Sequence, residues 1–115
     1  MLSFQRLHVY QRAIAFLALA TEIVELLPRG HAERSDQLIR AAESVVRNIA
    51  EGAGRWSPAD CRKHYRISRG EAMECASSLD VLKVRRLVTL ARYDEGLDHL
   101  VAIVAMLTKM SGDKA

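Results

Sequence analysis

The stretch Leu38 to Arg55 reads LIRAAESVVRNIAEGAGR and decides the fold of this chain. Its apolar residues recur at four-three-four spacing, which is typical of one wide face of an amphipathic helix. They are Leu38, Ala42, Val45 and Ile49, flanked by Ile39, Val46 and Ala50. Gly52 and Gly54 then end the helix, because glycine accepts the left-handed conformation of a helix cap. Ser57 and Pro58 begin the next helix as an N-cap and a first-turn residue. The stretch therefore predicts a helical hairpin with a tight glycine corner.

The rest of the chain extends this hairpin to an all-α fold. We expect one domain over residues 1–115, an antiparallel up-down-up-down four-helix bundle with helices over about 4–27, 35–52, 58–87 and 92–110. Ser35 or Asp36 is the expected N-cap of the second helix. Gly70 lies within the third helix, where we expect it to permit close contact with Ala41 or Ala42. Residues 111–115 should fray.

The first and fourth helices carry more apolar residues than one bundle core can bury. In the first helix the expected main stripe is Tyr10, Ile14, Leu17, Val24 and Leu27, and a second stripe is Val9, Phe16, Leu19 or Ala20, Ile23 and Leu26. In the fourth helix one face holds Leu97, Leu100, Val101, Val104 and Leu107, and the other Ile103, Met106 and Met110. Exposed second stripes would form a patch larger than soluble monomers usually show, so we expect a homo-oligomer.

Composition narrows the compartment. The two cysteines, Cys61 and Cys75, are fourteen residues apart in the expected third helix, roughly 21 Å at the standard rise, which excludes a bridge between them. A reducing cytoplasm is the expected location. Residues 13–20 resemble a short signal peptide, but the apolar stripe continues past them, which favours a core helix. No apolar run is long enough to span a membrane.

Motifs for metal binding and catalysis are not evident. Di-iron bundles need Glu-x-x-His on two helices, and none of the four histidines follows a glutamate by three. No serine or cysteine is placed on a strand-to-helix elbow, and no glycine-rich loop is placed to hold phosphates. We expect no enzyme activity, no metal and no cofactor.

A polar group accompanies the glycine corner. Glu51 and Arg55 are four residues apart in the favourable orientation for a helix pair, and Asn48 is close enough to the buried stripe to need a hydrogen-bond partner. We interpret Asn48, Glu51, Arg55 and Glu74 as a structural polar network, with Tyr65 or the start of the third helix as a partner. The alternative is a ligand pocket.

Basic residues give the clearest functional signal. The first cluster is Arg55, Arg62, Lys63, Arg66 and Arg69, and a second is Lys83, Arg85, Arg86 and Arg92. Arg62, Arg66 and Arg69 share one helical face, expected to point outward. Such stripes neutralise phosphates without reading sequence. The alternative is an ordinary solvated face with carboxylates from neighbours. We expect no aromatic residue to interleave with these arginines, so base stacking is not predicted.

Several motifs together resemble the bacterial four-helix bundle family, also called the 23S rRNA intervening-sequence protein family. They are SVVRNIAEGAGR from Ser44 to Arg55, then Ser57, Asp60, Arg69-Gly70 and Glu74, with Leu7-His8-Val9-Tyr10-Gln11 and Leu27-Pro28 near the start. Glu71 departs from the family, which usually has serine there. The family includes accessory variability determinant proteins of diversity-generating retroelements. The resemblance implies a pentamer-forming bundle, with nucleic-acid binding in some members and no established catalysis.

Two functions follow as expectations. The first is a non-enzymatic homo-oligomer that binds RNA or DNA non-specifically as an accessory protein, with a reverse transcriptase as a further partner. The alternative is a structural or adaptor oligomer that binds a protein. If Arg62, Arg66 and Arg69 are engaged in salt bridges, the adaptor function is favoured over nucleic-acid binding.

Overall fold

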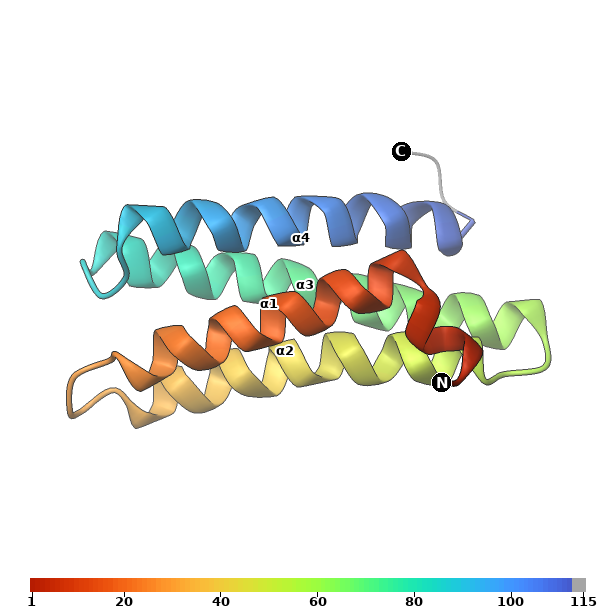
Figure 1. Ribbon diagram of the computed structural model, residues 1–115, viewed down its shortest axis with the longest axis horizontal. Coiled ribbons are helices and arrows are strands. Elements are labelled where there is room, and N and C mark those ends of the chain that lie inside the picture. The colour runs from red at the N-terminus through yellow and green to blue at the C-terminus, as the bar shows by residue number, and fades with distance from the viewer. Residues whose placement is uncertain (113–115) are drawn as a thin grey trace.

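Four long helices, preceded by one turn of 3-10 helix, make up the computed structural model, which describes residues 1–112 (Figure 1). The elements are η1 (Ser3–Arg6), α1 (His8–Glu25), α2 (Ala32–Ala53), α3 (Pro58–Val84) and α4 (Leu90–Met110). No strand occurs within residues 1–112. The predicted all-α fold is confirmed.

The helices run up and down in turn, and each packs against two neighbours. The contacting pairs are α1 with α2, α2 with α3, α3 with α4, and α4 with α1. Consequently η1, the α2–α3 connection and the C-terminal end of α4 all lie at one end of a bundle 45 Å long (Figure 1). This arrangement brings chain segments more than forty residues apart to the same end.

Two predicted starts of helices differ from the structure. Leu7 has an extended backbone (φ −62°, ψ 131°), which separates η1 from α1 where one continuous helix was expected. The second helix begins at Ala32 after His31, so neither Ser35 nor Asp36 is its N-cap. The Ser35 amide already donates to the His31 carbonyl at 3.0 Å, which places Ser35 within the first turn.

The connection from α3 to α4 covers residues 85–89, whereas residues 88–91 were expected. Helix α3 ends at Val84, and Arg86 takes a left-handed backbone conformation (φ 59°) that breaks the helix. Thr89 then caps α4, because its hydroxyl accepts a hydrogen bond from the Arg92 amide at 3.2 Å. The Thr89 hydroxyl was the sequence signal for a helix that starts at Leu90 rather than Arg92.

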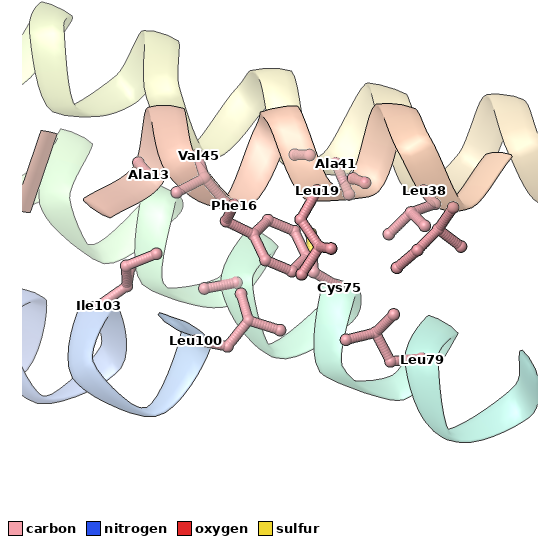
Figure 2. Packing of buried hydrophobic residues seen from close by; sticks show 14 of the residues in the cluster. Ala13, Phe16, Leu19, Leu38, Ala41, Val45, Cys75, Leu79, Leu100 and Ile103 are labelled. Carbon is pink, nitrogen blue, oxygen red and sulfur yellow. The ribbon is translucent and has the colours of Figure 1, made fainter. Parts of the chain in front are cut away.

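The core is built from one stripe of each helix (Figure 2). Its fully buried apolar residues are Val9, Ala13, Phe16, Leu19, Ala20, Ile23, Leu38, Ala41, Ala42, Val45, Ile49, Ala72, Cys75, Leu79, Leu82, Leu100, Ile103 and Leu107. In α1 this is the expected second stripe, so the assignment of the main stripe was wrong. Ile14 is 41% exposed, whereas Phe16 is 1% exposed. Figure 2 shows side chains of all four helices converging around Phe16.

Neither glycine at the α2–α3 corner has a positive φ, and Gly52 matters because it lacks a side chain. Gly54 has φ −89°, an ordinary right-handed value, so the predicted left-handed cap is wrong. Gly52 lies inside α2, and a Cβ there would come within 2.6 Å of the Tyr65 ring. The absence of that carbon lets α3 approach α2. Gly70 has no atom within 4 Å of such a Cβ, so the predicted contact with Ala41 or Ala42 is also wrong.

The end of α4 is ordered as far as it is described. Ser111 is fully buried, and its hydroxyl donates to the Leu107 carbonyl at 2.7 Å. Fraying from Ser111 onward was therefore wrong, and the same expectation for residues 113–115 lies outside the described residues.

Cys61 and Cys75 are free thiols. Across the described chain, every helix is too short or too polar to traverse a lipid bilayer.

Candidate nucleic-acid interface

Charge is divided unequally along the bundle. Ser68 contacts Val45, and Arg69 contacts Thr108, which places these four residues at one level of the bundle. We call the part beyond this level, residues 1–8, 45–69 and 108–112, the basic end. It holds eight lysine and arginine residues and two acidic residues. The other described residues hold eight basic and eleven acidic residues. One end therefore attracts anions, and the remainder does not.

The three arginines of the predicted stripe lie against the C-terminal turn of α4. Arg66 Nη2 donates to the Ser111 carbonyl at 3.0 Å, and Arg69 Nε donates to Thr108 Oγ1 at 2.9 Å. The Arg62 side chain packs beside Gly112, whose hypothetical Cβ would lie 3.1 Å from Arg62 Cδ. Carbonyls in a last helical turn lack helical partners and carry the negative end of the helix dipole, so they attract cations. Arg66 is exposed, as expected, whereas Arg62 and Arg69 are only partly exposed.

Two further members of the first cluster point to solvent. Lys63 is exposed on the first turns of α3. Arg55 Nη2 lies 2.9 Å from Glu51 Oε2, with both side chains about half exposed, so water screens this pair. Both cations are therefore accessible to an anionic partner.

Lys83 and Arg86 of the predicted site lie elsewhere. Lys83 Nζ sits 4.3 Å from the centroid of the Tyr93 ring, a cation–π contact. Twenty-one residues separate Arg62 from Lys83 on α3, roughly 32 Å at the helical rise. Lys83 and Arg86 belong to the part of the bundle where acidic residues prevail. Of the seven predicted residues, the structure brings together Arg55, Arg62, Lys63, Arg66 and Arg69.

The predicted polar network separates into distinct contacts. Asn48 Nδ2 donates to the Ser44 carbonyl and hydroxyl at 3.0 and 3.1 Å, and Asn48 Oδ1 lies 3.1 Å from His64 Nδ1. Asn48 therefore ties α2 to α3 independently of the Glu51–Arg55 pair. Glu74 lies far along α3, beside a groove described below. Tyr65 packs on Gly52, and burial, with a smaller effect of Cys61, raises its pKa.

Two features were missed from the sequence. Trp56 in the α2–α3 connection is 101% exposed and directly follows Arg55, so the expectation of no accompanying aromatic residue was wrong. A second feature links α1 to α4: Arg12 donates to His99 Nδ1 at 2.8 Å and to Asp98 Oδ2 at 2.6 Å. Burial and the Arg12 charge lower the pKa of His99 against the opposing effect of Glu95 and Asp98. Adjacency to Arg55 could have revealed Trp56, whereas the Arg12 contacts span 86 residues or more.

A polar groove of about 710 Å³ lies between α2 and α3 in the other half of the bundle. Its lining residues are Glu33, Arg34, Asp36, Gln37, Arg40, Glu74, Ser77, Ser78, Val81 and Leu82. Charges of both signs alternate there, so it does not select one ligand charge.

Within residues 1–112, no three histidine, cysteine or acidic side chains gather as metal ligands. The Cys75 thiol is buried, which, with Glu71 and Glu74, raises its pKa to about 12 and leaves it protonated.

Comparisons with known proteins agree with this architecture. The family model described as 23S rRNA-intervening sequence protein matches residues 5–109. The chain is also similar to the crystal structure of a protein with unknown function from the S23 ribosomal protein family of Bacteroides thetaiotaomicron VPI-5482, at a TM-score of 0.82 and 23% identity. That match covers 90% of this chain and 97% of the other, and at this identity it shows the fold alone. No curated protein matches.

Proposed function

This chain belongs to the 23S rRNA-intervening sequence protein family, and from that premise we propose that it is a non-enzymatic accessory protein that binds nucleic acid through its basic end. The contacts are electrostatic and of low sequence specificity, and a homo-oligomer, five subunits by family resemblance, presents several copies of them. A reverse transcriptase partner is part of the same proposal only through that resemblance.

The observation that carries the proposal is the segregation of charge. Eight basic residues against two acidic ones meet at the end where η1, the α2–α3 corner and the α4 C-terminus converge. Lysine and arginine side chains gathered on one surface neutralise backbone phosphates and release condensed counterions. A mixed surface, like that of the rest of the bundle, gives no such gain.

Arg66 and Arg69 contribute charge even though they contact α4. Arg69 donates from Nε to Thr108 Oγ1, and a guanidinium keeps its positive charge when it donates hydrogen bonds to neutral groups. The contact with α4 holds the side chains in place, which lowers the entropy lost when a phosphate binds. Arg66 and Arg69 therefore add positive charge at fixed positions, and Arg55 and Lys63 supply further accessible cations.

Apolar residues left exposed on α1 and α4 support the oligomer. Ile14 is 41% exposed and Leu26 is 63% exposed on or just after α1, and Leu90 and Val101 on α4 are 61% and 65% exposed. Association would remove these side chains from water. Repetition of the basic end around one assembly would raise the apparent affinity by a factor of about 10² or more where one strand reaches several copies.

The test uses two triple variants with the same change in net charge. Arg47→Gln/Arg55→Gln/Lys63→Gln removes exposed cations from the basic end, and Arg29→Gln/Arg40→Gln/Arg85→Gln removes exposed cations elsewhere. Binding to fluorescent RNA and DNA is measured by anisotropy between about 0.05 and 0.2 M salt. The parent's log affinity should fall steeply with log salt. The first variant should lose about two to three from that slope, and the control should keep it.

Equal effects of the two variants would refute a localised interface. Absence of binding by the parent at about 0.05 M salt, where counterion release is strongest, would refute the function itself.

A protein adaptor is the second candidate, favoured by a specific observation. Arg66 and Arg69 are engaged within the subunit, which reduces the charge that is free for phosphates. In that case the exposed apolar side chains of α1 and α4 would bind a partner protein. An assembly that binds no nucleic acid, and whose exposed Val101 is needed for binding a co-purified protein, would support the adaptor.

A further inference from the structure

Trp56 has the highest exposure of the large apolar side chains, at 101%. An exposed indole loses the hydrophobic gain of burial, which is why tryptophan is well buried on average. Tyr65 packs tightly on Gly52, four residues before Trp56, and neither this contact nor any other in the described part of the chain covers the indole. The indole is therefore accessible to a ligand or partner outside the subunit.

The backbone that carries Trp56 is held on both sides. Before it, the Arg55 amide donates to the Gly52 carbonyl at 3.2 Å, and the Cys61 thiol lies 3.5 Å from the Arg55 carbonyl. After it, the Ser57 hydroxyl accepts from the Asp60 amide at 3.1 Å. A fixed backbone presents the indole with little loss of loop entropy on binding.

The surroundings of Trp56 select the chemistry of its ligand. Arg55 precedes it, Arg62 and Lys63 follow on the first turns of α3, and the whole end has a large excess of positive charge. An apolar protein partner gains nothing from these cations, whereas a nucleic-acid strand supplies both a flat base and a phosphate. Bases in a duplex are already stacked on each other, but an unpaired base offers a free π-face.

We infer that Trp56 is a stacking platform for an unpaired nucleobase, so that the basic end prefers single-stranded or looped nucleic acid to a duplex. This inference rests on the proposed function and names its substrate class. The cations hold the backbone, and the indole stacks on one base without reading its identity.

Trp56 is the single tryptophan of the chain, so its fluorescence reports on the site directly. The probes are an oligothymidylate of about 16 nucleotides, matching the upper range of single-strand sites, and a blunt DNA duplex of equal length, at about 0.05 M salt. The single strand should quench the indole and the duplex should not. Trp56→Ala should weaken single-strand binding by about 5- to 100-fold and leave duplex binding unchanged. Trp56→Phe should retain most of the affinity.

The control is Val84→Ala, which trims an 83% exposed side chain at the other end of α3 and should change neither affinity. If Trp56→Ala binds the single strand as well as the parent does, the stacking inference fails and the proposed function stands. If the parent binds neither probe, the proposed function fails. A parallel loss for duplex and single strand would overturn the preference, and buried-indole emission from the free protein would show that another copy covers Trp56.

Discussion

At the scale of single residues, comparing Gly52 with Gly70 distinguishes a helical glycine that close packing requires from one that it does not. Both lie inside helices, but a Cβ at Gly52 meets the Tyr65 ring at 2.6 Å, and a Cβ at Gly70 meets nothing within 4 Å. Gly52→Ala should destabilise the bundle by about 1–3 kcal/mol, because the ring must shift. Gly70→Ala should stabilise it by about 0.5–1 kcal/mol through helix propensity. Urea unfolding of both variants measures this, and a stabilised Gly52→Ala would contradict the packing.

His99 gives the bundle a pH dependence that can be worked out in sign. Its folded pKa lies below the ordinary value of 6.5, because burial and Arg12 disfavour the charged ring. As the pH falls below about 6.5, the unfolded chain takes up the proton first, so stability is lost as pH falls through the folded pKa. Glu95 and Asp98 oppose this effect and limit its size.

The variant His99→Asn keeps an acceptor for Arg12 Nε and cannot titrate. Its unfolding midpoint should fall less than that of the parent between about pH 7.5 and 5.5. Thermal melts at the two pH values make the comparison. An identical fall in both proteins would show that His99 does not cause the pH dependence of stability.

Sequence reasoning at this scale succeeded where the cause is local. Ser57 caps α3 through the Asp60 amide, as its position before Pro58 predicts. It failed where the cause is a neighbour distant in sequence. The reason for Gly52 is the ring of Tyr65, and the partner of Arg12 is His99, neither of which periodicity can reveal. Trp56 was visible in the sequence, but its exposure was not.

At the scale of elements, the contact between α3 and α4 depends on Arg69 and Thr108. Thr108→Val removes the hydroxyl that accepts from Arg69 Nε while nearly preserving volume. It should cost about 0.5–1.5 kcal/mol, and the loss should be concentrated at the end of α4. Hydrogen exchange of the amides at 108–112 should accelerate relative to those at 96–104. Uniform acceleration along α4 would contradict a local role.

The helices themselves were predictable because each carries its own period and caps. The choice of the buried stripe in α1 was not, since Tyr10, Ile14, Leu17 and Leu27 repeat as regularly as the true core residues. Two apolar stripes on one helix are equivalent in sequence until neighbouring helices select one. The rejected stripe remains partly exposed, which is the origin of the proposed oligomer.

At the scale of the whole molecule, association can be tested on α4. Val101→Glu places a charge at a 65% exposed position and should leave the fold intact while disrupting an oligomer. Val84→Glu, at an 83% exposed position, is the control. Light scattering at micromolar concentration should give the parent and control a multiple of 12.9 kDa and the Val101 variant a smaller mass. A parent of 12.9 kDa would contradict the proposed assembly.

Charge segregation also belongs to this scale. The basic residues of the α2–α3 corner are clustered in sequence, but Arg6 and Lys109 join them because the up-down topology brings η1 and the end of α4 to the same end (Figure 1). The sequence indicated the cluster on α3, and the predicted up-down topology implied which segments share its end, but the contacts of Arg66 and Arg69 with α4 were not predicted. Lys83 and Arg86 were predicted as part of a second cluster, and they lie at or just after the other end of α3.

Lysine footprinting tests the central claim, binding at the basic end, within a single molecule. Lys63 and Lys109 lie at the basic end, and Lys83 lies at the other end of α3. Acetylation rates of the three are measured by mass spectrometry with and without saturating single-stranded nucleic acid at low salt. If nucleic acid binds at the basic end, Lys63 and Lys109 should be strongly protected and the acetylation rate of Lys83 should be unchanged. Protection of Lys83 with Lys63 and Lys109 unaffected would contradict it.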